Sequence, residues 1–410
     1  MSSTVQSAED IELPAFPIAR DGRCPFDPPA ALRQLQTQAP ITRVRLWDGS
    51  APWLVTRYAD QRRLLADPRV SADSELSGFP HGAANQSDSE AEGKTFVNMD
   101  GPEHARLRRM VVGSFSVKQM QALRPAVQRI VDGLIDDMLR GPQPVDLVEA
   151  FALPVTSMVI CQLLGVPYAD HGLFQDTTRL IFTRDIAPDV VQSAERTLTD
   201  YLDDLIGRKI ADPQDDLLSR LASEQIADGA LTRRELTSMA ILLLSAGHET
   251  SVNMISLGVV ALLEHPEQLA AVRDAEDPAR AEGAVEELLR YLNVAQMGRR
   301  RVALADIDVA GHTIRAGEGI VLPSDIANRD PDAFADPDRL DLHRDARRHI
   351  AFGFGPHMCL GAPLARVELQ VAYSTLFRRI PTLHLAVEVD ELSFNHQGLI
   401  FGVRELPIAW

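Results

Sequence analysis

Cys359 stands where a thiol could react or bind a metal. It follows Gly353, Gly355 and Pro356, and it comes just before an amphipathic stretch that predicts a helix over residues 362–378. The dipole and the free N–H groups at a helix start favour an anion, and glycines let backbone amides approach the sulfur closely. A thiolate in this place could be a nucleophile, a redox thiol or a metal ligand. A cysteine in isolation would more often be a buried core residue.

An acid and an alcohol interrupt the most apolar helical stretch of the chain. Residues 239–247 run directly into His248, Glu249 and Thr250. An unpaired carboxylate among apolar neighbours is costly, so its presence favours a function over a chance polar position. The pair His248-Glu249 begins like the zinc motif H-E-x-x-H, but Val252 occupies the place of the second histidine and no zinc pair forms.

Charged side chains recur at helical spacing in two further places. His104 and Arg108 lie at i,i+4, and Glu287 and Arg290 lie at i,i+3, so each pair shares one face of a helix. Taken alone, the first pair is typical of solvated cations and the second of a surface ion pair.

The pattern F-x-x-G-x-x-x-C-x-G, formed by Phe352, Gly355, Cys359 and Gly361, resembles the haem-ligand loop of the cytochromes P450. The resemblance extends over nearly the whole chain, from residue 24 to residue 410. It implies that Cys359 is the axial thiolate ligand of haem b (iron protoporphyrin IX). A thiolate in that position pushes electron density onto the iron and favours cleavage of the O–O bond.

The resemblance also implies roles for the other polar motifs. Gly247, after Ala246, would leave room for dioxygen, and Glu249 with Thr250 would form the acid–alcohol pair that delivers protons to it. Ser251 stands where the family often has a second threonine. The haem would be held by cations at its propionates and by the loop around the cysteine. The residues implied for this are His104, Arg108, Arg301, His357, Phe352, Gly353 and Gly361.

Two parts of this assignment stay open. The three consecutive arginines at residues 299–301 leave the register of the haem-binding arginine undecided. Glu287 and Arg290 resemble a buried pair that braces the core near the haem together with a third residue. Both Arg339 and Arg344 are candidates for that third place.

The substrate pocket should be built from mostly aliphatic positions close to the haem. The expected contacts are Phe174, Leu243, Leu244, Val294, Met297 and Ile400. The polar segment 71–94 lacks periodicity and would form either a lid over the pocket or a surface insertion. The sequence is most similar to actinomycete members of the family, which modify macrolides, polyenes, sterol-like compounds and drugs. An apolar small organic molecule is therefore the expected substrate.

Helices and strands must position these residues. Residues 42–58 predict a hairpin that turns at Asp48-Gly49, and Thr232 with Glu235 forms a capping box that predicts a helix extending to residue 264. Further helices are predicted over residues 60–66, 105–114, 117–139, 147–164, 194–211 and 281–291, strands over 302–322 and 385–408, and a coil over 330–348.

The order of these elements predicts the fold class. Because strands bracket the helices, we expect one mostly α-helical domain with small β-sheets over residues 1–410, beginning with a flexible segment, residues 1–22. The resemblance implies the cytochrome P450 fold, a triangular, helix-rich haem domain.

The composition excludes several classes of protein. The chain of 410 residues has 41 Lys and Arg against 58 Asp and Glu, a net charge of −17, which disfavours nucleic acid as a partner. Three cysteines cannot hold together a disulfide scaffold of this length, and 45% hydrophobic residues argue against disorder. No signal peptide or membrane-spanning run is visible, so we expect a soluble, cytoplasmic protein that does not bind membranes.

The resemblance implies a monooxygenase that inserts one atom of O2 into a C–H bond of an apolar small molecule. No flavin or nicotinamide domain fits inside the chain, so its electrons would come from a ferredoxin and its reductase. A basic patch of Arg106, Arg109, Arg347 and Arg348 would dock the acidic ferredoxin. The main alternative is a haem-thiolate sensor or ligand-binding protein without turnover. A peroxide-driven enzyme is disfavoured because the acid–alcohol pair is present.

Overall fold

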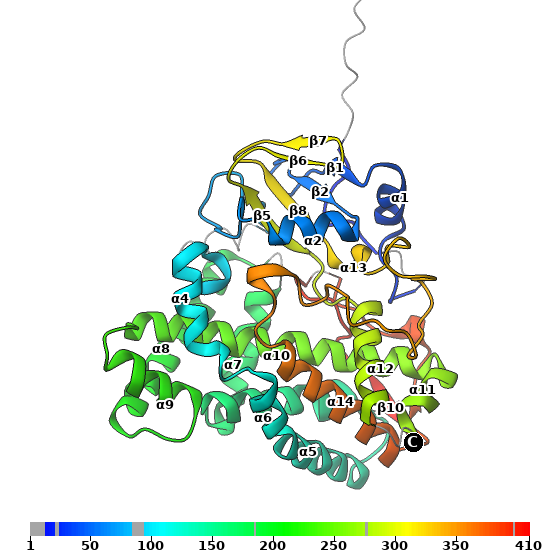
Figure 1. The fold of residues 1–410 in the computed structure, drawn as a ribbon. Helices are drawn as coiled ribbons and strands as arrows, with labels where there is room; N and C mark the ends of the chain where they lie inside the picture. The colour runs from blue at the N-terminus through cyan, green and yellow to red at the C-terminus, as the bar shows by residue number, and fades with distance from the viewer. Residues whose placement is uncertain (1–12, 21–23, 84–93, 184–185, 275–277, 397) are drawn as a thin grey trace, which may run out of the picture.

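A helix of 31 residues, α10 (Arg233–Leu263), crosses the middle of the molecule (Figure 1). At ~1.5 Å per residue it is about 46 Å long. The predicted capping box is confirmed, because the Thr232 hydroxyl accepts from the N–H of Glu235 and the Glu235 carboxylate accepts from the N–H of Thr232. The computed structural model describes residues 13–20, 24–83, 94–183, 186–274, 278–396 and 398–410.

The other helices surround α10, and α6, α8 and α14 pack directly against it. The predicted helix over residues 147–164 consists of a π-helical turn, Val148–Ala152, followed by α6. The helices are α1 (Ala30–Gln38), α2 (Tyr58–Ala66), α4 (Gly101–Val112), α5 (Val117–Arg140), α6 (Leu153–Leu164), α7 (His171–Phe182), α8 (Pro188–Ala211), α9 (Leu217–Leu221), α11 (Pro266–Arg273), α12 (Pro278–Tyr291), α13 (Ser324–Ala327) and α14 (Ala362–Arg379).

The described residues form three small sheets, with strand orders β1-β2-β8-β5-β3, β4-β10-β9 and β6-β7. The strands are β1 (Ile41–Arg43), β2 (Trp53–Val55), β3 (Val70–Ser71), β4 (Val145–Asp146), β5 (Arg299–Ala303), β6 (Ile307–Val309), β7 (His312–Ile314), β8 (Gly319–Leu322), β9 (His384–Leu385) and β10 (Pro407–Ala409). The predicted hairpin is confirmed: β1 and β2 are antiparallel, with Ile41 opposite Val55. Of the strand predicted over residues 385–408, the described residues form β9 and β10 at its two ends, with isolated bridges such as Phe394 to Val403 between them.

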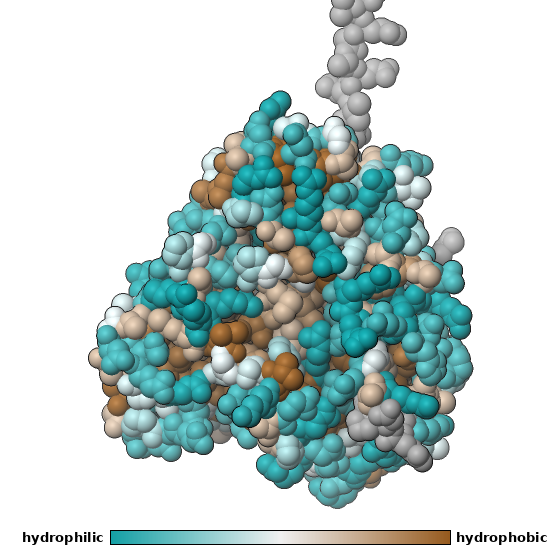
Figure 2. All heavy atoms as spheres, viewed as in Figure 1, coloured by the Kyte–Doolittle hydropathy of each residue, from teal (hydrophilic) through white to brown (hydrophobic). Residues whose placement is uncertain are grey.

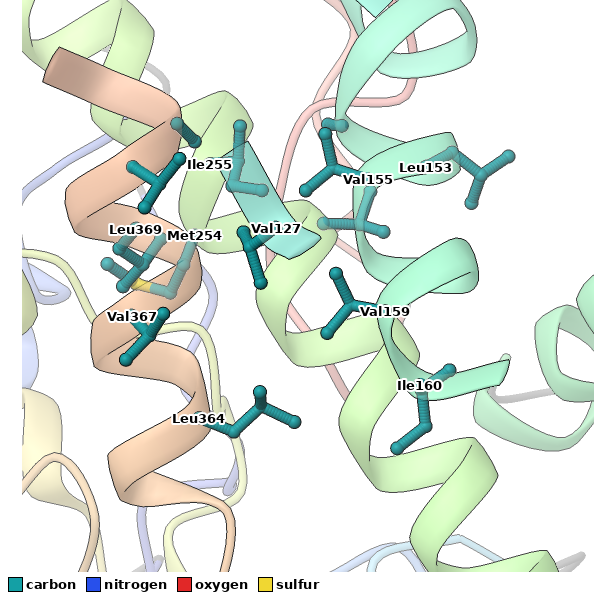
Figure 3. Close-up of a cluster of buried hydrophobic side chains, with 14 of the residues drawn as sticks. Val127, Leu153, Val155, Val159, Ile160, Met254, Ile255, Leu364, Val367 and Leu369 are labelled. Carbon is teal, nitrogen blue, oxygen red and sulfur yellow. The ribbon is translucent and has the colours of Figure 1, made fainter. Parts of the chain in front are cut away.

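The predicted fold class is confirmed. The five-stranded sheet lies at one corner of a roughly triangular outline, and the helices fill the wider part below it (Figure 1). The core lies between these helices. Figure 3 shows one part of it, where side chains of α5, α6, α10 and α14 meet, among them Val127, Val159, Met254 and Val367. Among the described helices, none is both long enough and apolar enough to cross a membrane.

The segment expected to be flexible, residues 1–22, is described only in part. Residues 1–12 and 21–22 lie outside the described residues. In the remainder, Phe16 is buried, and its N–H donates to the carbonyl of Arg45 at 2.9 Å. Residues 13–20 therefore pack against the region of the first hairpin.

The polar segment 71–94, expected to be a lid or an insertion, is described at both ends, whereas residues 84–93 lie outside the described residues. Lys94 lies at one end, and its Nζ is 3.0 Å from the carboxylate of Asp73 and 2.6 Å from that of Glu75 at the other end. These ion pairs join the two ends of the segment.

Candidate active site

Cys359 ends the loop that leads into α14, and its sulfur faces a cavity. The N–H of Cys359 donates to the carbonyl of Phe352 at 2.8 Å, which closes the loop. Gly353 and Gly355 both have φ of 75°, a conformation that L-residues rarely adopt. A Cβ on Gly355 would also collide with the backbone of Leu65 on α2. The two glycines thus allow the tight path that presents the sulfur to the cavity.

The cavity has a volume of about 290 Å³, and its wall is mostly apolar. α10 forms one side of it, and the cysteine loop with the start of α14 forms another. The predicted site residues that line it are Arg108, Leu243, Ala246, Gly247, Thr250, Arg301, Phe352, His357, Cys359 and Gly361.

Other predicted residues lie outside this lining. Leu244 and Phe174 have no exposed surface and belong to the core. Val294 and Ile400 lie on two segments that pair through their backbones: the carbonyl of Val294 accepts from the N–H of Phe401, and Ile400 forms a bridge with Ala295. Met297 is buried in the core under the five-stranded sheet. The described lining does not include these predicted substrate contacts.

Glu249 also lies outside the lining. Its carboxylate Oε1 is 3.6 Å from Nδ1 of the buried His248, and its side chain is 19% exposed. Thr250, the next residue, lines the cavity, and its hydroxyl donates to the carbonyl of Ala246 at 2.8 Å. The acid and the alcohol of the predicted pair therefore face different surroundings.

Gly247 faces the cavity close to Ile160 of α6, which also lines it. A Cβ at position 247 would lie 3.2 Å from Cδ1 of Ile160. Any larger residue here would press on α6 and reduce the space beside Thr250.

Cys359 is an exposed residue on the wall of the cavity. Burial raises the pKa of its thiol, while Arg299, the N–H groups of Gly361 and Ala362, and Arg108 act in the opposite direction. The predicted helix-start geometry is present, because α14 begins at Ala362. These groups would stabilise a thiolate once a metal ion compensates for its burial.

Two histidines and an aspartate form one end of the site. The rings of His104 and His357 stack with their centroids 4.2 Å apart. Burial, followed by the nearby His357, lowers the pKa of His104 to about 4. Burial opposes ionisation of Asp100, but hydrogen bonds from His357, Ser71 and the N–H of Ala72 outweigh it and lower the pKa of Asp100 to about 2.

The register of the three arginines follows from β5. Because side chains alternate along a strand, Arg299 and Arg301 lie on one face and Arg300 on the other. Arg299 and Arg301 both line the cavity, and Arg299 also donates to the carbonyl of Ala351 at 2.8 Å. Burial and the neighbouring Arg299 lower the pKa of Arg301 to about 10. The sequence alone left this choice open and did not identify Arg299 as a cavity residue.

These residues fit the expected haem. Nε2 of His104 and Nδ1 of His357 are buried without a hydrogen-bond partner in the part of the chain that is described. Arg108, Arg299 and Arg301 add positive charge to the same wall. Buried donors and cations are stable only when an acceptor or anion balances them, and the two propionates of haem are such groups.

The predicted bracing pair lies beneath the coil that leads to the cysteine loop. Arg290 and Glu287 are completely buried, with Nε and Oε2 2.6 Å apart. The third member is Arg344, whose Nε is 3.1 Å from Glu287 Oε1. Arg339 takes part through its backbone carbonyl, which accepts from Arg290.

Comparison with known proteins gives a consistent result. The family model described as Cytochrome P450 matches residues 69–408. Cytochrome P450 GfsF from Streptomyces halstedii is 53% identical over 405 residues, covering 98% of this chain and 97% of the relative. Vitamin D3 dihydroxylase from Streptomyces griseolus is 46% identical over 411 residues, covering 100% of both chains. The solved structure of mycinamicin VIII C21 methyl hydroxylase from Micromonospora griseorubida, bound to mycinamicin VIII, has a TM-score of 0.92 at 42% identity and covers 97% of this chain and 100% of that chain.

Proposed function

This chain belongs to the cytochrome P450 family and is a haem-thiolate monooxygenase, and from that premise we propose that Cys359 ligates the haem iron and that the enzyme hydroxylates a bulky apolar molecule. The observation that carries this proposal is the loop that presents the Cys359 sulfur to a mostly apolar cavity beside Thr250. The names of two relatives give their substrates as mycinamicin VIII and vitamin D3. A macrolide or a sterol-like compound is accordingly the substrate class we propose.

The haem, when bound, supplies the activation of dioxygen and the transfer of one oxygen atom to the substrate. The protein binds and orients it. His104, Arg108, Arg301 and His357 would hold the propionates. The residues that would shape the loop under the ring are Phe352, Gly353 and Gly361.

The residues of α10 would control the oxygen side of the site. Gly247 keeps space open beside Ile160, and Ala246 accepts the hydrogen bond that fixes the rotamer of Thr250. With its own proton engaged by Ala246, the Thr250 hydroxyl oxygen presents a hydrogen-bond acceptor to the cavity. It would relay a proton by giving up its own proton as its oxygen accepts another from a donor. Glu249 would deliver protons after its side chain turns from His248, and Leu243 would contact the substrate.

We expect Thr250→Ala to keep haem and substrate binding while releasing most of its reducing equivalents as hydrogen peroxide. The variant lacks the hydroxyl that passes protons at the cavity wall. The measurement is the ratio of product to peroxide at equal consumption of electron donor, with Thr250→Ser as the matched control that keeps the hydroxyl. Full coupling in Thr250→Ala would contradict the proposed role. Absence of any product from the wild-type enzyme with its donors would favour the sensor alternative.

We expect residues 1–410 to form one haem domain in the cytoplasm. This domain would receive its electrons from a ferredoxin and a ferredoxin reductase. Ion pairs within the chain reduce the net positive charge of the predicted basic patch. Arg106 pairs with Glu103 at 2.6 Å and also with Glu235, and Arg347 pairs with Asp345 at 2.8 Å. These partners compensate much of the charge of Arg106 and Arg347.

Arg109 is exposed on α4 and has no ion pair among the described residues, so we assign it the larger part in docking. The exposed apolar side chains of Val112 and Met358 lie on the same helix and on the cysteine loop. Figure 2 shows this face, where apolar residues gather near the centre and hydrophilic residues surround them. An apolar surface beside the exposed Arg109 suits an acidic ferredoxin.

Arg109→Glu should slow reduction by the ferredoxin roughly tenfold at low salt. The difference should shrink as salt rises, because screening weakens long-range attraction between exposed charges. The measurement is the rate of haem reduction in stopped-flow mixing, together with the substrate dissociation constant, which should not change. Arg129→Glu is the matched control, since Arg129 is also an exposed arginine but lies on α5 and not on α4. An equal effect of both variants, or no effect of Arg109→Glu, would contradict the docking surface.

A further inference from the structure

An acid other than Glu249 is part of the cavity wall, and it lies on α14. Glu368 is about two turns into α14, its residue is 1% exposed, and it is part of the cavity lining. Its carboxylate Oε2 accepts a hydrogen bond from the hydroxyl of Ser251 at 2.8 Å. Ser251 follows Thr250 on α10, and both residues also line the cavity.

No cation pairs with Glu368 among the residues that the structure describes. The nearby charged groups have other partners. On the helices, Arg366 pairs with Glu286 of α12, Arg124 of α5 donates to Gln370, and Arg108 of α4 donates to the carbonyl of Met358. On β5, Arg299 donates to the carbonyl of Ala351 and Arg301 to that of Arg300, while His357 contacts Asp100. Burial raises the pKa of Glu368 to about 8, against a smaller opposing effect of Ser251. An acid in such surroundings keeps its proton at neutral pH.

We propose that Glu368 is a buried proton donor to the active-site cavity that acts through Ser251 and is separate from Glu249. The proposal rests on the monooxygenase function, which consumes two protons in each turnover. For the transfer, the Ser251 hydroxyl, which donates to Glu368 Oε2 in the structure, turns toward a water molecule beside Thr250. Its oxygen then accepts the proton of the Glu368 carboxyl as its own proton passes to that water. No electron moves in this step. Glu368 is left as a carboxylate, which regains its proton from solvent water that enters the cavity between turnovers.

The competing explanation is a structural one, in which Glu368 and Ser251 only hold α14 against α10. The chain contains a matched example of such a contact. Tyr373 of α14 is buried and its hydroxyl donates to the carbonyl of Met254 on α10 at 2.5 Å. Tyr373→Phe removes a bond between the same two helices without removing an acid, so it reports the effect of bracing alone.

The main test is Glu368→Gln in the haem-loaded enzyme, since the glutamine amide preserves size and can still accept from Ser251. Infrared difference spectroscopy between the oxidised and the reduced enzyme should show the carbonyl stretch of a protonated carboxyl group in the wild type. This band should be absent in Glu368→Gln and should fade in the wild type as the pH rises through about 8. A wild-type spectrum without such a band, or a band that persists in Glu368→Gln, would overturn the proposal without any measurement of activity.

Turnover supplies the second readout. Glu368→Gln should lower the fraction of product severalfold and increase the solvent deuterium isotope effect, whereas Tyr373→Phe should change neither. Ser251→Ala should lower the fraction of product in the same way, and Ser251→Thr, which keeps a hydroxyl, should retain the wild-type fraction. These two variants keep the test decisive even if Glu368→Gln does not fold. If Glu368→Gln and Ser251→Ala couple normally while Thr250→Ala does not, this inference fails and the proposed function stands. If Thr250→Ala also couples normally, the proposed proton delivery itself fails.

Discussion

Cys359→Ala should abolish the Soret band that a thiolate-ligated haem shows when carbon monoxide binds to the reduced protein, and it should abolish hydroxylation. Alanine leaves the loop backbone in place but removes the sulfur that faces the cavity. Without a thiolate, the iron loses the electron donation that favours O–O cleavage. The measurement is the carbon monoxide difference spectrum of the purified variant, with haem content determined on the same sample.

The other two cysteines provide the controls. Cys161 is buried in α6, and burial raises the pKa of its thiol to about 12, so it stays protonated and is a poor ligand. Cys24 is partly buried near the N-terminal end of the described chain, and burial raises the pKa of its thiol as well. Cys24→Ala and Cys161→Ala should keep the thiolate band. A thiolate band that persists in Cys359→Ala would show that the ligand lies elsewhere.

The parts of the site that the sequence could predict are those in which local conformation fixes the chemistry. The positive φ of Gly353 and Gly355 and the helix start after Cys359 are properties of a few consecutive residues, so the cysteine loop could be recognised directly. The shared helix face of His104 and Arg108 is another local property. His104 stacks on His357, and Arg108 donates to the carbonyl of Met358 at 2.5 Å, so both meet the cysteine loop.

The parts that the sequence could not predict depend on contacts between distant segments. Arg106 has the character of a free surface cation in the sequence, but the start of α10 brings Glu235 beside it. Glu368 is one acid among many in a helical stretch. Only the packing of α14 on α10 shows that it faces Ser251 at the cavity wall. Leu244 has the same character as Leu243 in the sequence, but the rotation of α10 places one in the core and the other on the cavity.

The bracing network links the cysteine loop to Glu287, a residue outside the cavity lining. Glu287 accepts from Arg290, from Arg344 and from the N–H of Asp341 at 3.0 Å. Arg290 in turn donates to the carbonyls of Asn328 and Pro337 at 2.9 and 2.8 Å. The side-chain Oδ1 of Asn328 accepts from the N–H of Ile350 at 2.8 Å, just before the cysteine loop begins. The Glu287 carboxylate therefore holds in place the coil that leads into the cysteine loop.

Glu287→Ala should destabilise the protein by about 3–5 kcal/mol, because it leaves the fully buried Arg290 without a counter-charge. We expect little haem-loaded, folded protein, since the coil before the cysteine loop loses its anchor. Glu282→Ala is the matched control: Glu282 is an exposed acid on the same helix, and its loss should leave thermal stability and the haem-to-protein ratio near those of the wild type. Glu287→Gln should fall between the two, because the amide keeps part of the hydrogen bonding but lacks the charge. A stable Glu287→Ala holoprotein would show that Arg344 and the backbone carbonyls hold the coil without this carboxylate.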